Sequence, residues 1–161
     1  MPPVKSLNVL GDKIDILVNG QMTNGASATF IQTTKPGGGP PPHRHSREDE
    51  TFTVLEGEFE LLIDGQWKAT VGEVFFAPRG GVHTFRNSGS TIGRILVFIA
   101  PAGFENFFEK VSGLNPESDM PKILEACTEY GYPCTPQRRE TYRELAHCPQ
   151  HPSRIQSIME G

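Results

Sequence analysis

Short runs of β-branched and aromatic residues, each bounded by turn residues, dominate the first hundred residues of the chain. They are Ile14–Val18, Ala28–Thr34, Glu50–Leu55, Phe59–Ile63, Trp67–Val71, Val74–Pro78, Val82–Arg86 and Arg94–Ile99. Runs of this length are typical of strands, and Asp64-Gly65 between two of them is a strong hairpin signal, because glycine accepts the positive φ of a tight turn. Several short strands at this spacing predict an antiparallel sandwich or barrel.

The sequence changes character after residue 101. Between residues 104 and 111 the apolar side chains recur at i, i+3, i+4 and i+7, which is the spacing of one helix face. A second helix is predicted over Met120–Tyr130 and a third from about Gln137 to Ala146. We therefore expect a β-barrel over residues 1–101 and, over 102–161, a helical extension of the same domain that packs on the outside of the barrel.

Composition excludes several classes of function. The 15 basic and 19 acidic residues give a net charge of −4, whereas nucleic-acid binders usually have a basic excess. The longest apolar stretch, Ile95–Ala102, is too short to span a membrane, and the N-terminal residues lack the apolar core of a signal peptide. An odd number of cysteines, Cys127, Cys134 and Cys148, favours free thiols in a reducing cytoplasm, with Cys127 buried on a helix face.

Three histidines and one glutamate form the group most typical of a chemical site. His43 and His45 are two residues apart, and residues at that spacing in an extended segment point to the same face. Glu50 follows in the next predicted strand, and His83 lies thirty-three residues further on. Imidazoles with a carboxylate bind a divalent metal such as Fe, Mn, Ni, Cu, Co or Zn. The alternative is ordinary surface histidines beside a solvated glutamate, and spacing alone leaves both open.

Glycines and prolines at fixed spacing surround this group. The first segment reads GxxxxxHxHxxxxExxxxxxG from Gly37 to Gly57, and the second reads GxxxxxPxGxxHxxxN from Gly72 to Asn87. Together they resemble the two-part signature of the cupin superfamily in its single-domain form. Within that superfamily the text GGGPPPHRHSREDETFTVLEGEFE, with FFAPRGGVHTFRN, resembles the bacterial quercetin-dioxygenase-like cupins. The resemblance covers roughly residues 26–111.

This resemblance implies a mainly β fold, the cupin double-stranded β-helix or jelly-roll barrel, with one divalent transition metal inside. Carried over by position, the metal ligands are His43, His45, Glu50 and His83, and Asn87 has a structural role. Four protein ligands on a six-coordinate metal would leave two positions open for catalysis or ligand binding.

The period of two residues along a strand extends the expected site into the barrel. Phe52 and Val54 share the face of Glu50, Phe85 shares the face of His83, and Phe98 on the last strand is expected to complete an apolar substrate-binding wall. The alternative for each of these aromatic residues is plain core packing.

Other polar residues receive weaker assignments. We expect Arg47–Asp49 to form a solvated turn, and Gln32 and Arg94 either to line the mouth of the cavity or to face solvent. The Cys/His group at residues 147–151 lacks a second pair at zinc-finger spacing.

Three functions remain open. The first is a quercetinase-like, metal-dependent dioxygenase that acts on an aromatic or enolic hydroxyl compound, with Glu50 either a ligand or the acceptor of the substrate proton. The second is a cupin isomerase or lyase that uses the metal as a Lewis acid. The third is a barrel that binds a small ligand without turnover. The expected partner is a small molecule, with neither nucleic acid nor membrane, and we expect a homodimer.

Overall fold

The computed structural model describes residues 2–63, 66–69 and 71–132. These residues form nine strands and two helices: β1 (Lys5–Val9), β2 (Asp12–Val18), β3 (Ala28–Thr34), β4 (Asp49–Glu56), β5 (Phe59–Ile63), β6 (Gln66–Ala69), β7 (Val74–Ala77), β8 (His83–Asn87), β9 (Gly93–Ala100), α1 (Glu105–Val111) and α2 (Met120–Glu129). The eight predicted strands and the first two predicted helices are present within one to three residues of the expected bounds. The expected turn at residues 64–65 and the third helix lie outside the described residues.

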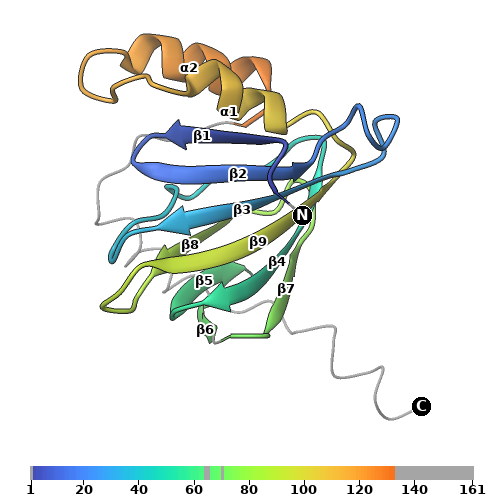
Figure 1. Cartoon of the computed structure of the whole chain (residues 1–161). Helices are drawn as coiled ribbons and strands as arrows, with labels where there is room; N and C mark the ends of the chain where they lie inside the picture. The colour runs from blue at the N-terminus through green and yellow to red at the C-terminus, as the bar shows by residue number, and fades with distance from the viewer. Residues whose placement is uncertain (1, 64–65, 70, 133–161) are drawn as a thin grey trace.

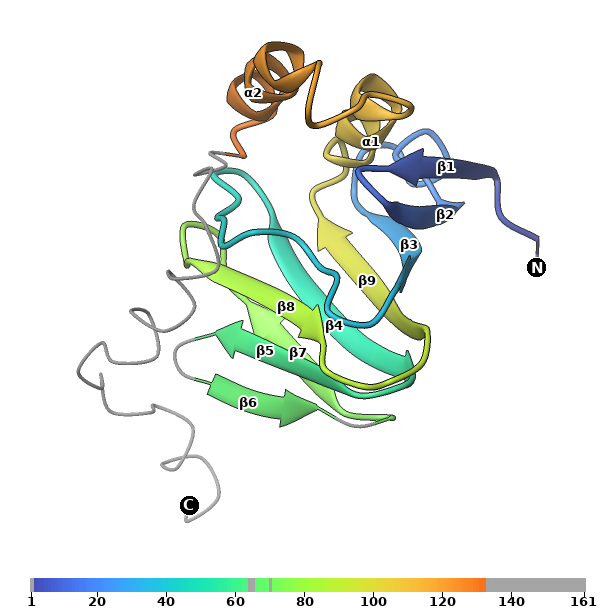
Figure 2. The same cartoon turned by 90° about the vertical axis from the view of Figure 1, so that its left-hand side faces the viewer.

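The strands form two antiparallel sheets. The larger sheet has the order β1-β2-β3-β9-β4-β7, and the smaller has the order β6-β5-β8. The sheets face each other as the two sides of a barrel, and α1 and α2 lie together at one end, beside β1 and β2 (Figures 1 and 2). The fold is mainly β, as predicted. Sequence analysis missed β1, an edge strand that is mostly exposed and therefore carries little of the apolar alternation that reveals a strand.

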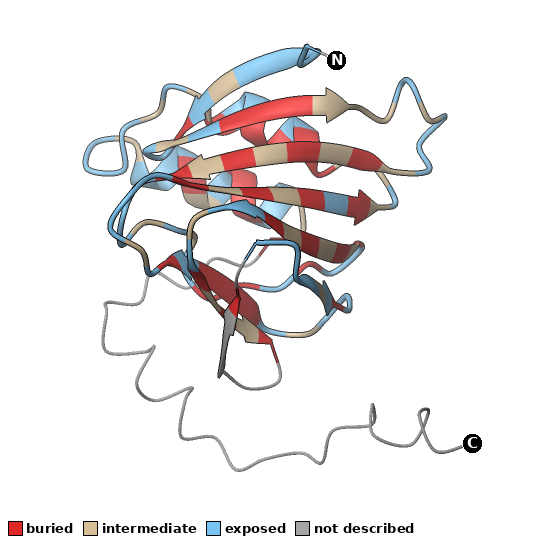
Figure 3. Ribbon diagram, turned by 60° about the horizontal axis from the view of Figure 1, so that its bottom comes forward, coloured by how far each residue is buried: buried red, intermediate tan, exposed pale blue. Residues whose placement is uncertain are grey.

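The barrel interior is filled by every second residue of the central strands. β3 and β9 alternate regularly between buried and partly exposed positions, which Figure 3 shows as stripes along the ribbon. On β9 the buried set contains Ile95, Val97 and Ile99, whereas Phe98 is 44% exposed. The expectation that Phe98 faces the cavity is therefore wrong. Val97 pairs with both Phe30 and Phe52, and directly opposed residues share a face, so Val97 points inward with them.

The two helices are attached to the barrel through buried groups. Phe107, Phe108 and Val111 form the buried face of α1. The Glu105 carboxylate, also buried, accepts hydrogen bonds from the backbone N–H groups of Gly20 (2.7 Å) and Gly103 (2.7 Å), so its charge is satisfied at the base of the helix. Neither helix in the described part of the chain is long and apolar enough to cross a membrane.

The α2 helix begins after Asp119 and buries Ile123, Ala126 and Cys127. Cys127 lies on the apolar helix face, as expected, but it is disulfide-bonded. The odd cysteine count made disulfides unexpected, so this bond corrects that expectation.

Candidate metal centre

The four predicted ligand residues meet inside the barrel. Glu50 lies on β4 and His83 begins β8, so the two sheets each contribute one of them. His43 lies in the segment before β4 and forms an isolated β-bridge with His83, in which each backbone N–H donates to the other residue's carbonyl oxygen (3.0 and 2.8 Å). The backbone N–H of Gly80 donates to the carbonyl oxygen of His45 (2.7 Å). Backbone hydrogen bonds between the two signature segments therefore fix the backbone positions from which the three imidazole side chains extend.

Two further contacts hold these segments in register. A side chain at Gly39, where φ is +141°, would collide with the carbonyl oxygen of Phe85, so only glycine allows this approach to β8. Arg79 binds Asp49 through both its backbone N–H (2.8 Å) and its guanidinium (2.6 Å). This contact ties the loop before β8 to the start of β4 and lowers the pKa of Asp49 to about 2.

The side chains converge closely. One ligand atom from each of His43, His45, Glu50 and His83 lies within 4.8 Å of all the others, and all four residues are buried. Oε2 of Glu50 lies 2.7 Å from Nε2 of His83 and 3.4 Å from Nε2 of His45. Ligands that share one metal at about 2.0–2.2 Å are separated by about 3–4 Å, so this spacing is close to that of a coordination shell.

The hydrogen bonds of the imidazoles leave their Nε2 atoms available for a metal. Nδ1 of His43 faces the carbonyl oxygen of Pro41 (2.8 Å) and Nδ1 of His83 faces that of Gly81 (3.1 Å). A carbonyl only accepts, so Nδ1 is the donor in each of these two rings, and Nε2 is the nitrogen of each that can bind a metal. Burial, with the neighbouring His83 and His45, lowers the pKa of His43 well below its ordinary range, which favours the neutral form that binds metals.

The Glu50 carboxylate lies directly against the imidazole nitrogens of His83 and His45. Two acceptors 2.7 Å apart repel unless a proton or a metal ion lies between them. Three neutral imidazoles and one carboxylate are a donor set for a divalent transition metal. The residues present therefore fit such an ion.

A second buried carboxylate lies beside His45, and sequence analysis missed it. Glu48 was expected in a solvated turn, but it is only 4% exposed. Its Oε2 lies 3.6 Å from Nδ1 of His45, and neither atom has a hydrogen-bond partner among the residues that the structure describes. Carboxylates commonly orient metal-binding histidines through the ring nitrogen that faces away from the metal. The position of Glu48 is suited to this role.

Residues after the barrel cover the ligand group. The ring of Tyr132 lies 4.5 Å from that of His43, and the ring of Phe104 lies 4.3 Å from that of His45, measured between centroids. Gly131, with φ of +65°, accepts a hydrogen bond from the N–H of Ser46 (3.1 Å), so the end of α2 contacts the loop between His45 and Glu50. The helical extension thus contributes to the site itself, a role that the local sequence pattern does not reveal.

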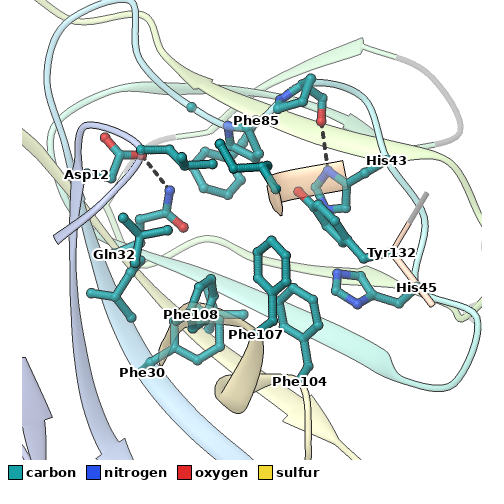
Figure 4. A pocket seen from close by; sticks show the side chains of 18 of the residues that line it. Asp12, Phe30, Gln32, His43, His45, Phe85, Phe104, Phe107, Phe108 and Tyr132 are labelled. Atoms are coloured by element: carbon teal, nitrogen blue, oxygen red, sulfur yellow. Dashed lines mark hydrogen bonds between the residues drawn. The ribbon is translucent and has the colours of Figure 1, made fainter. Parts of the chain in front are cut away.

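A cavity of about 280 Å³ opens from the ligand group into the barrel (Figure 4). Most of its wall is apolar and aromatic, and the residues that form this part include Phe30, Phe52, Phe85, Phe104, Phe107, Phe108 and Tyr132. Of the predicted substrate-binding residues, Phe52 and Phe85 line the cavity. Val54 is buried in the core without lining it, and Phe98 faces outward.

The far wall of the cavity contains a polar pair that was not predicted to be buried. Gln32 is 9% exposed and its Nε2 donates to Oδ2 of Asp12 (2.6 Å). Burial raises the pKa of Asp12, and the hydrogen bond from Gln32 partly offsets that shift. Arg94, the other candidate for the cavity mouth, does not line the cavity.

Comparison with known proteins shows similarity over the barrel residues. Residues 30–99 match the family described as "Cupin domain". The chain is 40% identical over 74 residues to an uncharacterized protein of Aquifex aeolicus, an alignment that covers 45% of this chain and 56% of that protein. It is 42% identical over 67 residues to germin-like protein subfamily 2 member 2 of Arabidopsis thaliana, covering 38% of this chain and 31% of that protein. The chain thus spans about half or less of the length of these curated relatives.

Solved structures share the fold. The structure of KdgF from Halomonas sp. superposes with a TM-score of 0.57 at 18% identity, over 63% of this chain and 90% of that one. At this identity the likeness concerns the fold alone. The match of residues 30–99 to this domain and the shared fold agree with the resemblance that the sequence motifs indicate.

Proposed function

We propose that the protein is a metal-dependent dioxygenase that acts on a small aromatic or enolic hydroxyl compound. The observation that carries the proposal is the position of the buried His43, His45, Glu50 and His83 group at one side of a cavity with aromatic walls. A cavity with aromatic walls suits an apolar ring, and His43, His45 and Glu50 add metal-binding groups to one side of its described lining.

The histidines would hold the metal, and Glu50 would hold the metal or accept a proton. His43, His45 and His83 would hold the ion through Nε2. A redox-active ion bound there would supply activation of the substrate oxygen and of dioxygen. Glu50 would complete the ligand set or accept the proton of the substrate hydroxyl, since its Oε2 already lies among the imidazole nitrogens.

The aromatic wall would position the ring of the substrate. The rings of Phe52 and Phe85 meet edge to face with centroids 5.9 Å apart. On the helical wall the rings of Phe104 and Phe107 stack with centroids 5.1 Å apart. Aromatic pairs of this kind leave ring faces and edges available to a flat ligand. Orientation by these groups would hold the reacting carbon close to the metal.

A cupin isomerase or lyase is the second candidate function, since the same four ligands could hold a Lewis-acid metal. A sugar or other polyhydroxylated substrate requires several polar anchors in the cavity. Among the described residues that line it, none is a lysine or arginine. The wall therefore favours an apolar substrate over a polyhydroxylated or phosphorylated one.

Oxygen consumption distinguishes these functions. Protein purified without chelator is analysed for Fe, Mn, Ni, Cu, Co and Zn, and oxygen uptake is then measured with flavonols and with acyclic enediols. The proposal predicts a redox-active metal and uptake that depends on both protein and substrate. Bound redox-active metal with no uptake across the panel would contradict the dioxygenase assignment and leave isomerisation or ligand binding.

A further inference from the structure

The side-chain amide of Gln32 lies in the wall of the cavity, and a hydrogen bond to Asp12 fixes its orientation. Its Nε2 donates to Oδ2 of Asp12 (2.6 Å), and the hydroxyl of Thr34 donates to the same oxygen (3.2 Å). An ionised carboxylate only accepts hydrogen bonds, so the NH₂ of Gln32 must face Asp12. The amide oxygen, Oε1, is therefore directed away from Asp12.

The amide oxygen of Gln32 has no protein partner. Within the part of the chain that the structure describes, no hydrogen bond is made to Oε1, although the residue is only 9% exposed and lines the cavity. Figure 4 shows Gln32 and Asp12 on the side of the cavity opposite His43 and His45, with aromatic rings between the two polar groups. An acceptor on the cavity wall that no described residue occupies is available to a donor that enters the cavity.

The strand register places Gln32 far from the metal ligands. Glu50 on β4 pairs with Ile99 on β9, and Ile99 pairs with Ala28 on β3. Gln32 lies four residues further along β3 than Ala28, which corresponds to about 13 Å along the strand. The two polar groups therefore contact opposite ends of any ligand that fills the space between them.

We propose that Gln32 is a second anchoring point, which selects ligands by a hydrogen-bond donor at the end remote from the metal. The ligand class is a flat, apolar ring system with an oxygen donor for the metal at one end and a hydroxyl or N–H group at the other. This inference rests on the proposed function for the metal-binding end. Asp12 acts behind Gln32 as a positioning residue, because it holds the amide with its oxygen toward the ligand.

Equilibrium binding without turnover tests the anchor. The metal-containing protein is titrated under anaerobic conditions with 3-hydroxyflavone and with the derivatives that carry one additional hydroxyl on the phenyl ring, and the dissociation constants are compared. One hydrogen bond to a buried acceptor predicts that at least one derivative binds about 3–10-fold more tightly than the parent compound. Equal binding of the parent and all derivatives by the wild-type protein would overturn the anchor.

Substitution of Gln32 separates the anchor from the metal end. Gln32→Met keeps the length of the side chain but removes the acceptor, so it should abolish the preference for the hydroxylated derivative and leave the binding of 3-hydroxyflavone within about 2-fold of wild type. Thr33→Val, on the neighbouring position of β3, is the matched control and should retain the preference. A preference that persists in Gln32→Met protein would overturn the anchor, whereas failure of every flavonol to bind would contradict the proposed function as well.

Discussion

The metal-ligand side of the cavity and its helical wall are built by different parts of the chain. His43, Glu50 and His83 lie in or beside β4 and β8, and reciprocal backbone hydrogen bonds hold the segments together. The adjoining wall, with Phe104 and Phe107, comes from the segment after the barrel. The ligand side therefore depends on strand pairing, and the wall depends on side-chain packing.

This difference indicates that metal binding and ligand selectivity depend on different parts of the chain. The ligand group lies within residues 30–99, the part that matches the cupin domain, whereas α1, α2 and Tyr132 lie outside it. A change at Phe107, whose ring packs on Phe104 and Tyr132, can thus alter the shape of the cavity while the residues that contact the imidazoles directly are kept. We expect the metal affinity and the ligand preference of this protein to respond to separate sets of substitutions.

Removal of a metal ligand should have the largest effect and should leave the wall intact. His83→Ala is expected to lose most of the bound metal, because each protein ligand contributes to the site, while the barrel remains folded. Metal content by elemental analysis and far-UV circular dichroism measure the two properties. Arg86→Ala, at an exposed position of the same strand, is the control. Stoichiometric metal in His83→Ala protein would refute the ligand assignment.

Truncation of the helical wall should have the opposite outcome. Phe107 is 3% exposed, so Phe107→Ala is expected to lower the free energy of unfolding by about 3–5 kcal/mol while metal content is retained. Phe98→Ala removes the same atoms from the outer face and should change the free energy by no more than about 0.5 kcal/mol. Chemical denaturation measures both. Equal losses in the two variants would mean that Phe107 does not pack as described.

Glu48 tests whether the ligand side extends beyond the four ligands. Glu48→Gln preserves the size of the side chain but removes its charge beside Nδ1 of His45, and we expect metal affinity to fall about 10–100-fold. A competition titration against a chelator of known affinity measures the change. Glu58→Gln, at an exposed position, should bind metal as wild type does. An unchanged affinity in Glu48→Gln protein would show that this carboxylate does not orient His45.

Asp12 should give the smallest effect, a change in pH dependence. Burial raises its pKa in the folded state, so its contribution to stability is present below the ordinary value of about 4 and is lost as the pH rises through the raised value. The amide of the Asp12→Asn variant has no carboxyl group to titrate in this pH range. The free energy of unfolding of the variant should therefore improve relative to wild type between about pH 3 and pH 7, whereas parallel pH profiles would contradict the shift.

Much of the fold and all four members of the ligand group could be predicted from local sequence. The central strands alternate clearly because one face is buried and the other is not, as in β3. Strand geometry explains the spacing of His43 and His45, whereas the set of four ligands was expected from the resemblance to the two-part signature. Asn87 was also expected to be structural, and its side-chain amide donates to the carbonyl oxygens of Thr34 (2.9 Å) and Thr91 (2.8 Å).

The remaining features depend on contacts between distant segments. The run containing Phe98 is apolar on both faces, so its composition does not say which face is buried, and only pairing with β3 and β4 settles it. Glu48 and Gln32 are polar residues whose burial results from the loops and strands that surround them. The contribution of α1 and α2 to the cavity depends on how the helices meet the end of the barrel, which helix periodicity alone does not specify.

The metal content of the wild-type protein tests the central claim most directly. Protein purified without chelators, or reconstituted with Fe, Mn, Ni, Cu, Co or Zn and freed of excess ion, is analysed by elemental mass spectrometry against protein concentration. The geometry of His43, His45, Glu50 and His83 predicts one divalent transition-metal ion per chain. Folded protein that retains no ion above background after every reconstitution would contradict the account.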